Sequence, residues 1–200
     1  MPVSFITDES LEAKIQKSLS IQFDEELEAF TSGLLPADHV FRLGFPGKIL
    51  LNAGFPKEKE IQLKGSILNS KKTRHLFDVK ELKGLVDSIA NPVAVFTYWN
   101  DRGRNIIVDI AHGDNKYLVG IQFVDSDGNP LQISSIRTIF PKNTANWIHW
   151  FEQGKGVYVN KNKLQSLITQ QRTNLADVNH LDLESIDRII SKITAVNVSD

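Results

Sequence analysis

The stretch KKTRHLFDVKELKGLVDSIANPVAVFTYW, Lys71–Trp99, decides the fold, because the hydrophobic period changes within it. Asp78 followed by Glu81 forms a capping box, which predicts the start of a helix. Apolar residues follow at helical spacing, at Val79, Leu82, Val86 and Ile89. Asn91-Pro92 ends that helix, and Val93–Trp99 then has the pattern of a strand. The sequence therefore predicts a helix that leads directly into a sheet.

Three more strands are predicted downstream, separated by turns rich in Asn, Asp and Gly. They are Asn105–Ala111, Lys116–Val124 and Leu131–Phe140. Short turns between such runs predict an antiparallel meander of four strands. Upstream, apolar residues at spacings of three and four predict a helix, and they are Leu11, Ile15, Leu19, Phe23, Leu27 and Phe30.

Short pieces complete the pattern on both sides of the meander. Three β-like pieces precede it, at Val40–Leu43, Lys48–Asn52 and Glu60–Leu68. Helices are expected after it at Asn146–Gln153, Lys161–Gln171 and Asp182–Ile193, with an extended piece at Gly156–Asn160. We therefore expect an α+β fold in which N-terminal helices pack on a four-stranded antiparallel meander sheet, with additional C-terminal helices. The expected division is an N-terminal helical segment (1–36), a central domain (37–172) and a tail helix (173–200).

The bulk composition excludes several classes of protein. The 200 residues are 41% hydrophobic and carry a net charge of −1, so any polyanion site must be a local patch. The chain has no cysteine, which removes thiolate metal sites and favours a reducing compartment, and we expect a cytoplasmic protein. No apolar run reaches the length of about 20 residues that spans a bilayer. Glycine-rich nucleotide loops and metal-ligand spacings are missing, so no cofactor is expected.

Two clusters of polar residues are candidates for chemistry. Lys71, Lys72, Arg74 and His75 precede the predicted cap, where a helix N-terminus favours phosphate. His75 has the pKa range of a general acid or base, although a packing residue before a cap has the same sequence position. The second cluster is SSIRTIFPKN, Ser134–Asn143. Strand alternation places Ser135 and Arg137 on one face and Thr138 on the other, unless a bulge intervenes.

The second cluster offers a hydroxyl and cations. Arg137 can bind a phosphate through its forked guanidinium, and Ser135 or Thr138 can donate to a developing oxyanion. Lys142 and Asn143 extend this group, although an exposed strand and turn have the same composition. Trp147, Trp150 and Phe151 could stack on bases, but at helical spacing such residues also build a core.

The chain resembles the phage MuF-type C-terminal nuclease domain over Asp38–Arg172. The segments that carry the resemblance are FRLGFPGKILLNAGFPKEKEIQLKGSIL, RHLFDVKELKGLVDSIANPVAVFTY, IIVDI, ISSIRTIFPKN and GVYVNKNKLQSLI. The resemblance implies a fold shared with the barnase, EndoU, colicin-type and RelE ribonucleases, and a metal-independent RNase of phage, mobile-element or toxin type. A tyrosine often follows the family hydroxyl, whereas Phe140 follows Thr138 here.

Carried onto this chain, the resemblance implies catalytic roles for His75, Lys142 and either Ser135 or Thr138. It also implies that the phosphates are bound by Lys71, Lys72, Arg74, Arg137 and Asn143. The expected function is RNA cleavage by general acid/base transphosphorylation. The alternatives are a catalytically inactive relative that binds protein or nucleic acid, and an unrelated structural module. RNA is the expected partner, and an immunity protein that covers such a site is expected to be acidic there.

Overall fold

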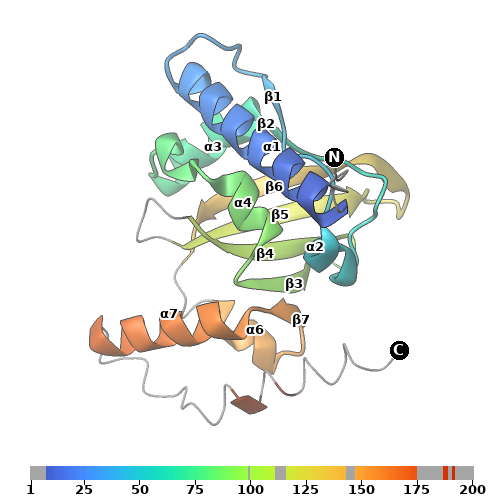
Figure 1. Cartoon of the computed structure of the whole chain (residues 1–200), viewed down its shortest axis with the longest axis vertical. Coiled ribbons are helices and arrows are strands. Elements are labelled where there is room, and N and C mark those ends of the chain that lie inside the picture. The colour runs from blue at the N-terminus through green and yellow to red at the C-terminus, as the bar shows by residue number, and fades with distance from the viewer. Residues whose placement is uncertain are drawn as a thin grey trace, which may run out of the picture.

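A mixed sheet of seven strands forms the centre of the molecule, in the order β1-β2-β6-β5-β4-β3-β7 (Figure 1). The computed structural model describes residues 8–98, 100–110, 116–142, 147–174, 187, 188 and 191. The strands are β1 (Val40–Arg42), β2 (Ile61–Lys64), β3 (Ala94–Tyr98), β4 (Gly103–Asp109), β5 (Lys116–Val124), β6 (Pro130–Pro141) and β7 (Gly156–Val159). β2 runs parallel to β6, and the other neighbouring strands are antiparallel.

The α+β class is confirmed, but the predicted four-stranded antiparallel meander sheet is wrong. Strands β3 to β6 are neighbours in a wider sheet, which β1 and β2 extend on one side and β7 on the other. Short turns indicate hairpins between strands that follow each other in the chain. The pairing of Ile61 with Ser134 joins strands far apart in sequence, so no turn indicates it.

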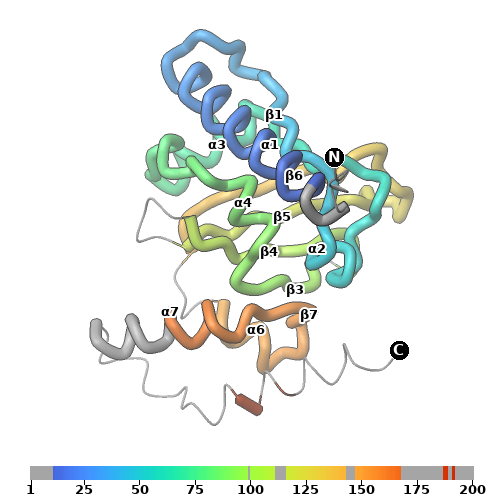
Figure 2. The backbone as a smooth tube through the Cα atoms, in the orientation of Figure 1, coloured from blue at the N-terminus to red at the C-terminus, as the bar shows by residue number. Residues whose placement is uncertain are grey.

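Helices cover both faces of the sheet. On one face lie α1 (Asp8–Thr31), α3 (Gly65–His75), the 3-10 helix η1 (Val79–Leu82) and α4 (Leu85–Ala90). They share a first core with the sheet, which includes Phe23, Leu27, Leu68, Leu82, Val86, Ile106, Val119 and Ile136. Figure 2 shows α1 running across α4 on this side. α2 (Lys48–Asn52) lies between β1 and β2 in the chain.

The second face is covered by α6 (His149–Glu152) and α7 (Lys161–Asn174), which lie beyond β3 in Figure 2. The second core contains Val93, Ala94, Phe96, Ile107, Leu118, Trp147, Ile148, Phe151, Leu164 and Leu167. Phe140 and Trp150 pack against it and stay half-buried. The sheet contributes Ala94 and Phe96 from β3, Ile107 from β4 and Leu118 from β5 to this core, so the rest of this face over β5 and β6 is lined differently.

Several local predictions were wrong. Lys48–Asn52 is a helix, and Glu60–Leu68 divides into β2 and the first turn of α3. The helix predicted from Asp78 is interrupted, because Gly84 takes a φ of 81° and α4 begins after it. The Asp78 carboxylate does accept a hydrogen bond from the Lys80 N–H, at 2.9 Å.

The region from Asp182 to Ile193, predicted as a tail helix, lies outside the described residues except for 187, 188 and 191. Within the described part of the chain, no helix is both long enough and apolar enough to cross a bilayer.

Candidate functional site

A polar area lies on the second face of the sheet, over β4, β5 and β6. Leu118, Gly120 and Gln122 alternate along β5 and therefore share one face, and Leu118 belongs to the second core. Cross-strand partners share that face. Gly120 pairs with Asn105 on one side and Thr138 on the other, and Gln122 pairs with Ser135. We call the area formed by these residues the polar face: Asn105, Gly120, Gln122, Ser135 and Thr138.

A bulge in β6 brings the two candidate hydroxyls together. The pairing with β5 moves from Gly120↔Thr138 to Ile121↔Ile136, so Arg137 has no partner in β5. Such an extra residue shifts the alternation of faces by one. The prediction that Ser135 and Arg137 share a face, with Thr138 on the other, is therefore wrong. Ser135 and Thr138 both lie on the polar face, and Arg137 is exposed.

Gly120 forms the floor between Thr138 and Asn105. A Cβ placed on Gly120 would lie 2.6 Å from Thr138 Cγ2 and 3.2 Å from Asn105 Oδ1. The two side chains therefore approach each other above a residue that has none. Asn105 Oδ1 is buried and has no hydrogen-bond partner within the described residues. Buried polar atoms normally have a hydrogen-bond partner, so a ligand that brings a donor to Asn105 Oδ1 would be favoured here.

His75 reaches this face from the end of α3. Helix α3 follows β2 directly and contacts β6, and the His75 ring stacks on Phe140 with centroids 4.3 Å apart and planes 13° apart. Phe140 pairs with Leu118, so its side chain lies on the same face as Thr138. The stack places an imidazole at the margin of the polar face.

The setting of His75 differs from the prediction. Lys72, Arg74 and His75 lie in the last turn of a helix, whereas a loop before a helix N-terminus was expected. A helix C-terminus favours cations, so it gives no support for phosphate binding through the dipole. The pKa of His75 is lowered, first by partial burial and then by the charges of Lys71 and Arg74. A lowered pKa keeps the imidazole neutral, and thus able to accept a proton, at neutral pH.

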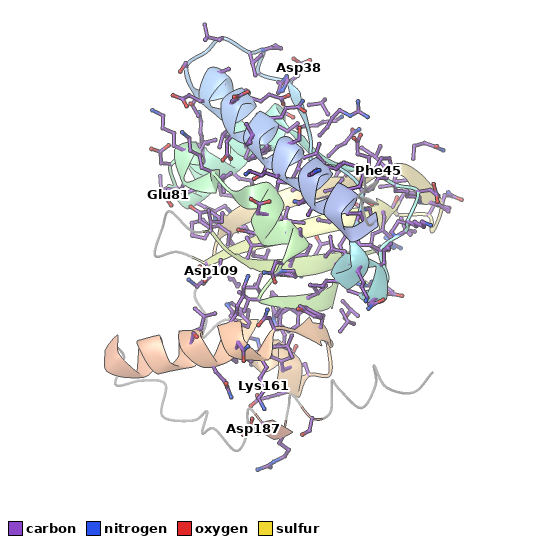
Figure 3. The ribbon with its side chains drawn as sticks, viewed as in Figure 1. Asp38, Phe45, Glu81, Asp109, Lys161 and Asp187 are labelled. Carbon is purple, nitrogen blue, oxygen red and sulfur yellow. The ribbon has the colours of Figure 1, made fainter. Side chains whose placement is uncertain are left out.

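Lys142 supplies a cation next to the same aromatic ring. Its Nζ lies 5.8 Å from the ring centroid of Phe140 and 5.6 Å from that of Trp150. Its backbone N–H donates to the Lys116 carbonyl at 2.8 Å, and the Lys116 ammonium lies 2.6 Å from the Asp109 carboxylate. Figure 3 shows Asp109 between the sheet and α7. The charge of Lys116 is paired with Asp109. Of these two lysines, Lys142 is therefore the one that brings a cation to the aromatic rings.

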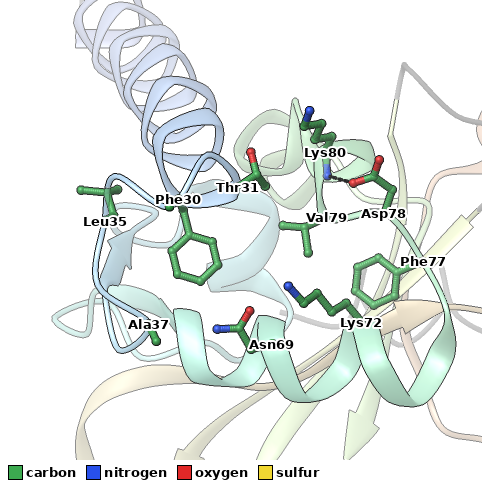
Figure 4. Close-up of a pocket in the computed structure, with 11 residues that line it drawn as sticks. Phe30, Thr31, Leu35, Ala37, Asn69, Lys72, Phe77, Asp78, Val79 and Lys80 are labelled. Carbon is green, nitrogen blue, oxygen red and sulfur yellow. Dashed lines mark hydrogen bonds between the residues drawn. The ribbon is translucent and has the colours of Figure 1, made fainter.

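The remaining predicted residues are dispersed. Lys72 lines a separate pocket of about 390 Å³ between the end of α1, α3 and η1. Figure 4 shows its side chain there, between Phe77 and Asn69. Lys71 is half-buried and Arg74 is exposed beside His75. Asn143 lies outside the described residues. The structure therefore gathers His75, Ser135, Thr138 and Lys142 around one face and separates Lys72 from them.

Sequence reasoning missed Asn105, Gln122 and Gly120. For Gly120 and Gln122 a signal was present, because they interrupt the otherwise apolar run YLVGIQFV, whereas Asn105 follows Gly103 and Arg104 and gives no such signal. Three or more His, Cys, Asp or Glu side chains arranged to hold a metal ion are not found among the described residues.

Comparison with known proteins gives one match. The model of the phage MuF-C-terminal domain family matches residues 66–166, just over half of the chain, and this range contains α3 except for its first residue, and every residue of the polar face. Comparisons with curated proteins and with solved structures gave no match. The chain belongs to the phage MuF-C-terminal domain family.

Proposed function

We propose that this member of the phage MuF-C-terminal domain family cleaves RNA by general acid/base transphosphorylation without a metal ion. One observation carries the proposal. His75 and Lys142 contact the same ring, Phe140, on the sheet face where Ser135 and Thr138 lie. A neutral imidazole, two hydroxyls and an ammonium on one surface are the groups that cleavage of a phosphodiester beside a 2′-hydroxyl requires.

In the proposed reaction, His75 takes the proton of the ribose 2′-hydroxyl. The 2′-oxygen forms a bond to phosphorus, and the bond from phosphorus to the 5′-oxygen breaks, which leaves a 2′,3′-cyclic phosphate. The departing 5′-oxygen takes a proton from the Lys142 ammonium or from water. The hydroxyl of Thr138 or Ser135 donates to a non-bridging oxygen while its charge develops. The lowered pKa of His75 increases the fraction of neutral imidazole, the form that can accept this proton.

Phosphate binding on either side of the scissile bond is assigned to the cations near this face. Lys71 and Arg74 lie beside His75, as their effect on its pKa indicates. Arg137 is exposed at the bulge of β6, next to Thr138 in the chain. Such contacts are electrostatic, so RNA binding should weaken as salt is raised.

The test is cleavage of total RNA and of tRNA by the purified protein in EDTA. We expect His75→Ala to lower the rate by about 10²- to 10⁴-fold, the usual contribution of a general base. Lys142→Ala should also lower it. Lys17→Ala is the matched control, since Lys17 is an exposed lysine on α1, which covers the opposite face. Cleavage that EDTA abolishes, or that His75→Ala leaves unchanged, would contradict the proposal.

A second candidate function is a binding module without catalysis. Phe140 favours it, because the MuF-type domains that the chain resembles often have a tyrosine after the hydroxyl, and Phe140 has no phenol. The same surface would then bind a nucleic acid or a protein. Salt-dependent RNA binding that requires Lys142, together with intact RNA at high protein concentration, would favour this reading.

The proposed activity also implies a partner and a cellular compartment for the protein. Its partner is RNA, and it acts in the cytoplasm as an effector of phage, mobile-element or toxin type. An immunity protein would have to neutralise Lys142 and the cations around His75, so its contact surface should be acidic.

A further inference from the structure

A pocket of about 860 Å³ opens beside the polar face, at the end of β3 and β4 nearest their connecting turn. Its lining includes Tyr98, Asn105, Trp150 and Lys155. The pocket meets the proposed catalytic surface at Asn105, which pairs with Gly120 and approaches Thr138 above it. A ligand in this pocket would therefore lie next to Asn105, whose side chain approaches Thr138 above Gly120.

Trp150 presents an aromatic ring that the second core does not fully cover. Its ring meets Phe96 edge to face, with centroids 5.3 Å apart and planes 81° apart, which fixes its orientation. Trp147 and Phe151 are buried, whereas Trp150 is half-buried and lines the pocket. Lys142 Nζ lies 5.6 Å from the same ring, so Trp150 contacts both the pocket and the ammonium proposed to act on the scissile phosphate.

Asn105 adds a hydrogen-bonding group at the opposite margin. Its Oδ1 is buried over Gly120 and has no partner among the described residues. Burying an amide oxygen unpaired is unfavourable, so a turn of the carboxamide toward a ligand would relieve this cost. A carboxamide can donate and accept at once, and so matches the edge of a nucleobase. Lys155, which is exposed, adds a cation to the lining.

We infer that this pocket binds one nucleobase of the RNA, stacked on Trp150 and hydrogen-bonded to Asn105, beside the phosphate that Lys142 contacts. The inference rests on the proposed function, for which it names a base-binding subsite. Aromatic side chains bind bases of single strands by stacking, and hydrogen bonds to base edges distinguish one base from another. Of the three aromatic residues in the segment Trp147–Phe151, only Trp150 lines this pocket.

The experiment measures binding of the four nucleoside 3′-monophosphates to the full chain by calorimetry, with ribose 5-phosphate and inorganic phosphate as ligands without a base. At least one nucleotide should bind about tenfold or more tightly than ribose 5-phosphate, in line with the contribution of one stacked base. In NMR spectra, the indole N–H of Trp150 and the side-chain amide of Asn105 should shift with nucleotides and stay in place with inorganic phosphate.

Variants separate the subsite from the fold and from the phosphate contact. Trp150→Leu and Asn105→Ala should reduce nucleotide affinity to that of ribose 5-phosphate and leave phosphate affinity unchanged. Trp150→Phe keeps a ring on Phe96 and should retain most of the preference, which controls for damage to the second core. Lys142→Ala should weaken all phosphate ligands and keep the preference for a base.

Two outcomes overturn the inference: nucleotides that bind no more tightly than ribose 5-phosphate, or a preference that Trp150→Leu and Asn105→Ala leave intact. RNA cleavage that requires His75 in either of these cases would leave the proposed function standing without its subsite. Base-dependent binding that requires Trp150, in a protein that cleaves no RNA, would instead support the pocket and contradict the nuclease.

Discussion

Gly120→Ala tests the geometry of the polar face directly. The backbone of Gly120 has no positive φ, so alanine fits the strand without strain. In open space the change would stabilise the protein by about 0.4–1 kcal/mol, because alanine restricts the unfolded chain. Here the new methyl group would lie 2.6 Å from Thr138 Cγ2 and 3.2 Å from Asn105 Oδ1. Overpacking of this kind typically costs about 1–3 kcal/mol. A decrease in the free energy of unfolding would therefore indicate the close contact with Thr138, and an increase would indicate open space.

Urea denaturation of four proteins measures this contact. Thr138→Ser removes the methyl group nearest the added Cβ and keeps the hydroxyl. We expect Gly120→Ala to lower the free energy of unfolding by about 1–3 kcal/mol in the natural chain. In the Thr138→Ser background the cost should fall by at least about 1 kcal/mol, since two residues in contact are not additive. The contact of 3.2 Å with Asn105 remains, so the relief should be partial.

The same variants report on function. If substrate occupies the space above Gly120, then Gly120→Ala should lower the rate of RNA cleavage even in the Thr138→Ser background, where the fold is relieved. Thr138→Ser alone should keep most of the activity. A Gly120→Ala protein that is as stable as the natural chain, or equally destabilised in both backgrounds, would refute the close approach of Thr138 to Gly120.

Three further predictions concern charged groups around the fold. Lys71→Ala should raise the lowered pKa of His75 towards its ordinary value of about 6.5, so the acid limb of any pH–rate profile should move up in low salt, and an NMR titration of His75 checks this. Tyr117→Phe loses the 2.5 Å hydrogen bond to the Glu81 carboxylate and should cost about 1–3 kcal/mol in urea denaturation at pH 7. Burial first, and then Glu81, raise the pKa of Tyr117; the natural chain should therefore lose stability above pH of about 10, where the unfolded tyrosine ionises, and Tyr117→Phe should lose less. Asp78→Ala removes the cap of η1 and should lower the midpoint of thermal unfolding, by the equivalent of about 1 kcal/mol.

The features that were predictable from sequence are those set by local chemistry. Alternating apolar residues and tight turns predicted the strands now seen as β3, β4, β5 and β6, and Asp78 was identified as a capping residue. These signals depend on residues within a few positions of each other. The same holds for the C-terminal pieces, where Gly156–Val159 forms an edge strand and Lys161–Asn174 a helix.

The features that escaped prediction are set by contacts over long sequence distances. The segment GSILNSKKTRH, Gly65–His75, has only Leu68 as a buried apolar side chain, so its helical period is invisible in the sequence. It is a helix that packs along β6, whose pairing partner β2 ends at Lys64. KILLN, Lys48–Asn52, is too short for its period to distinguish a strand from a helix.

Individual residues of the candidate site could be predicted from the sequence, but their arrangement could not. The bulge at Arg137 shows why. Spacing alone separates Ser135 from Thr138, because an odd interval in a regular strand places side chains on opposite faces. One unpaired residue reverses this, and both hydroxyls then face the same side as Phe140 and Gln122. The choice between Ser135 and Thr138 therefore becomes a question of distance to His75. Phe140 lies two residues beyond Thr138 on that face and carries the stacked imidazole, so Thr138 is the hydroxyl nearer His75, the proposed base, whereas Ser135 lies beside Gln122.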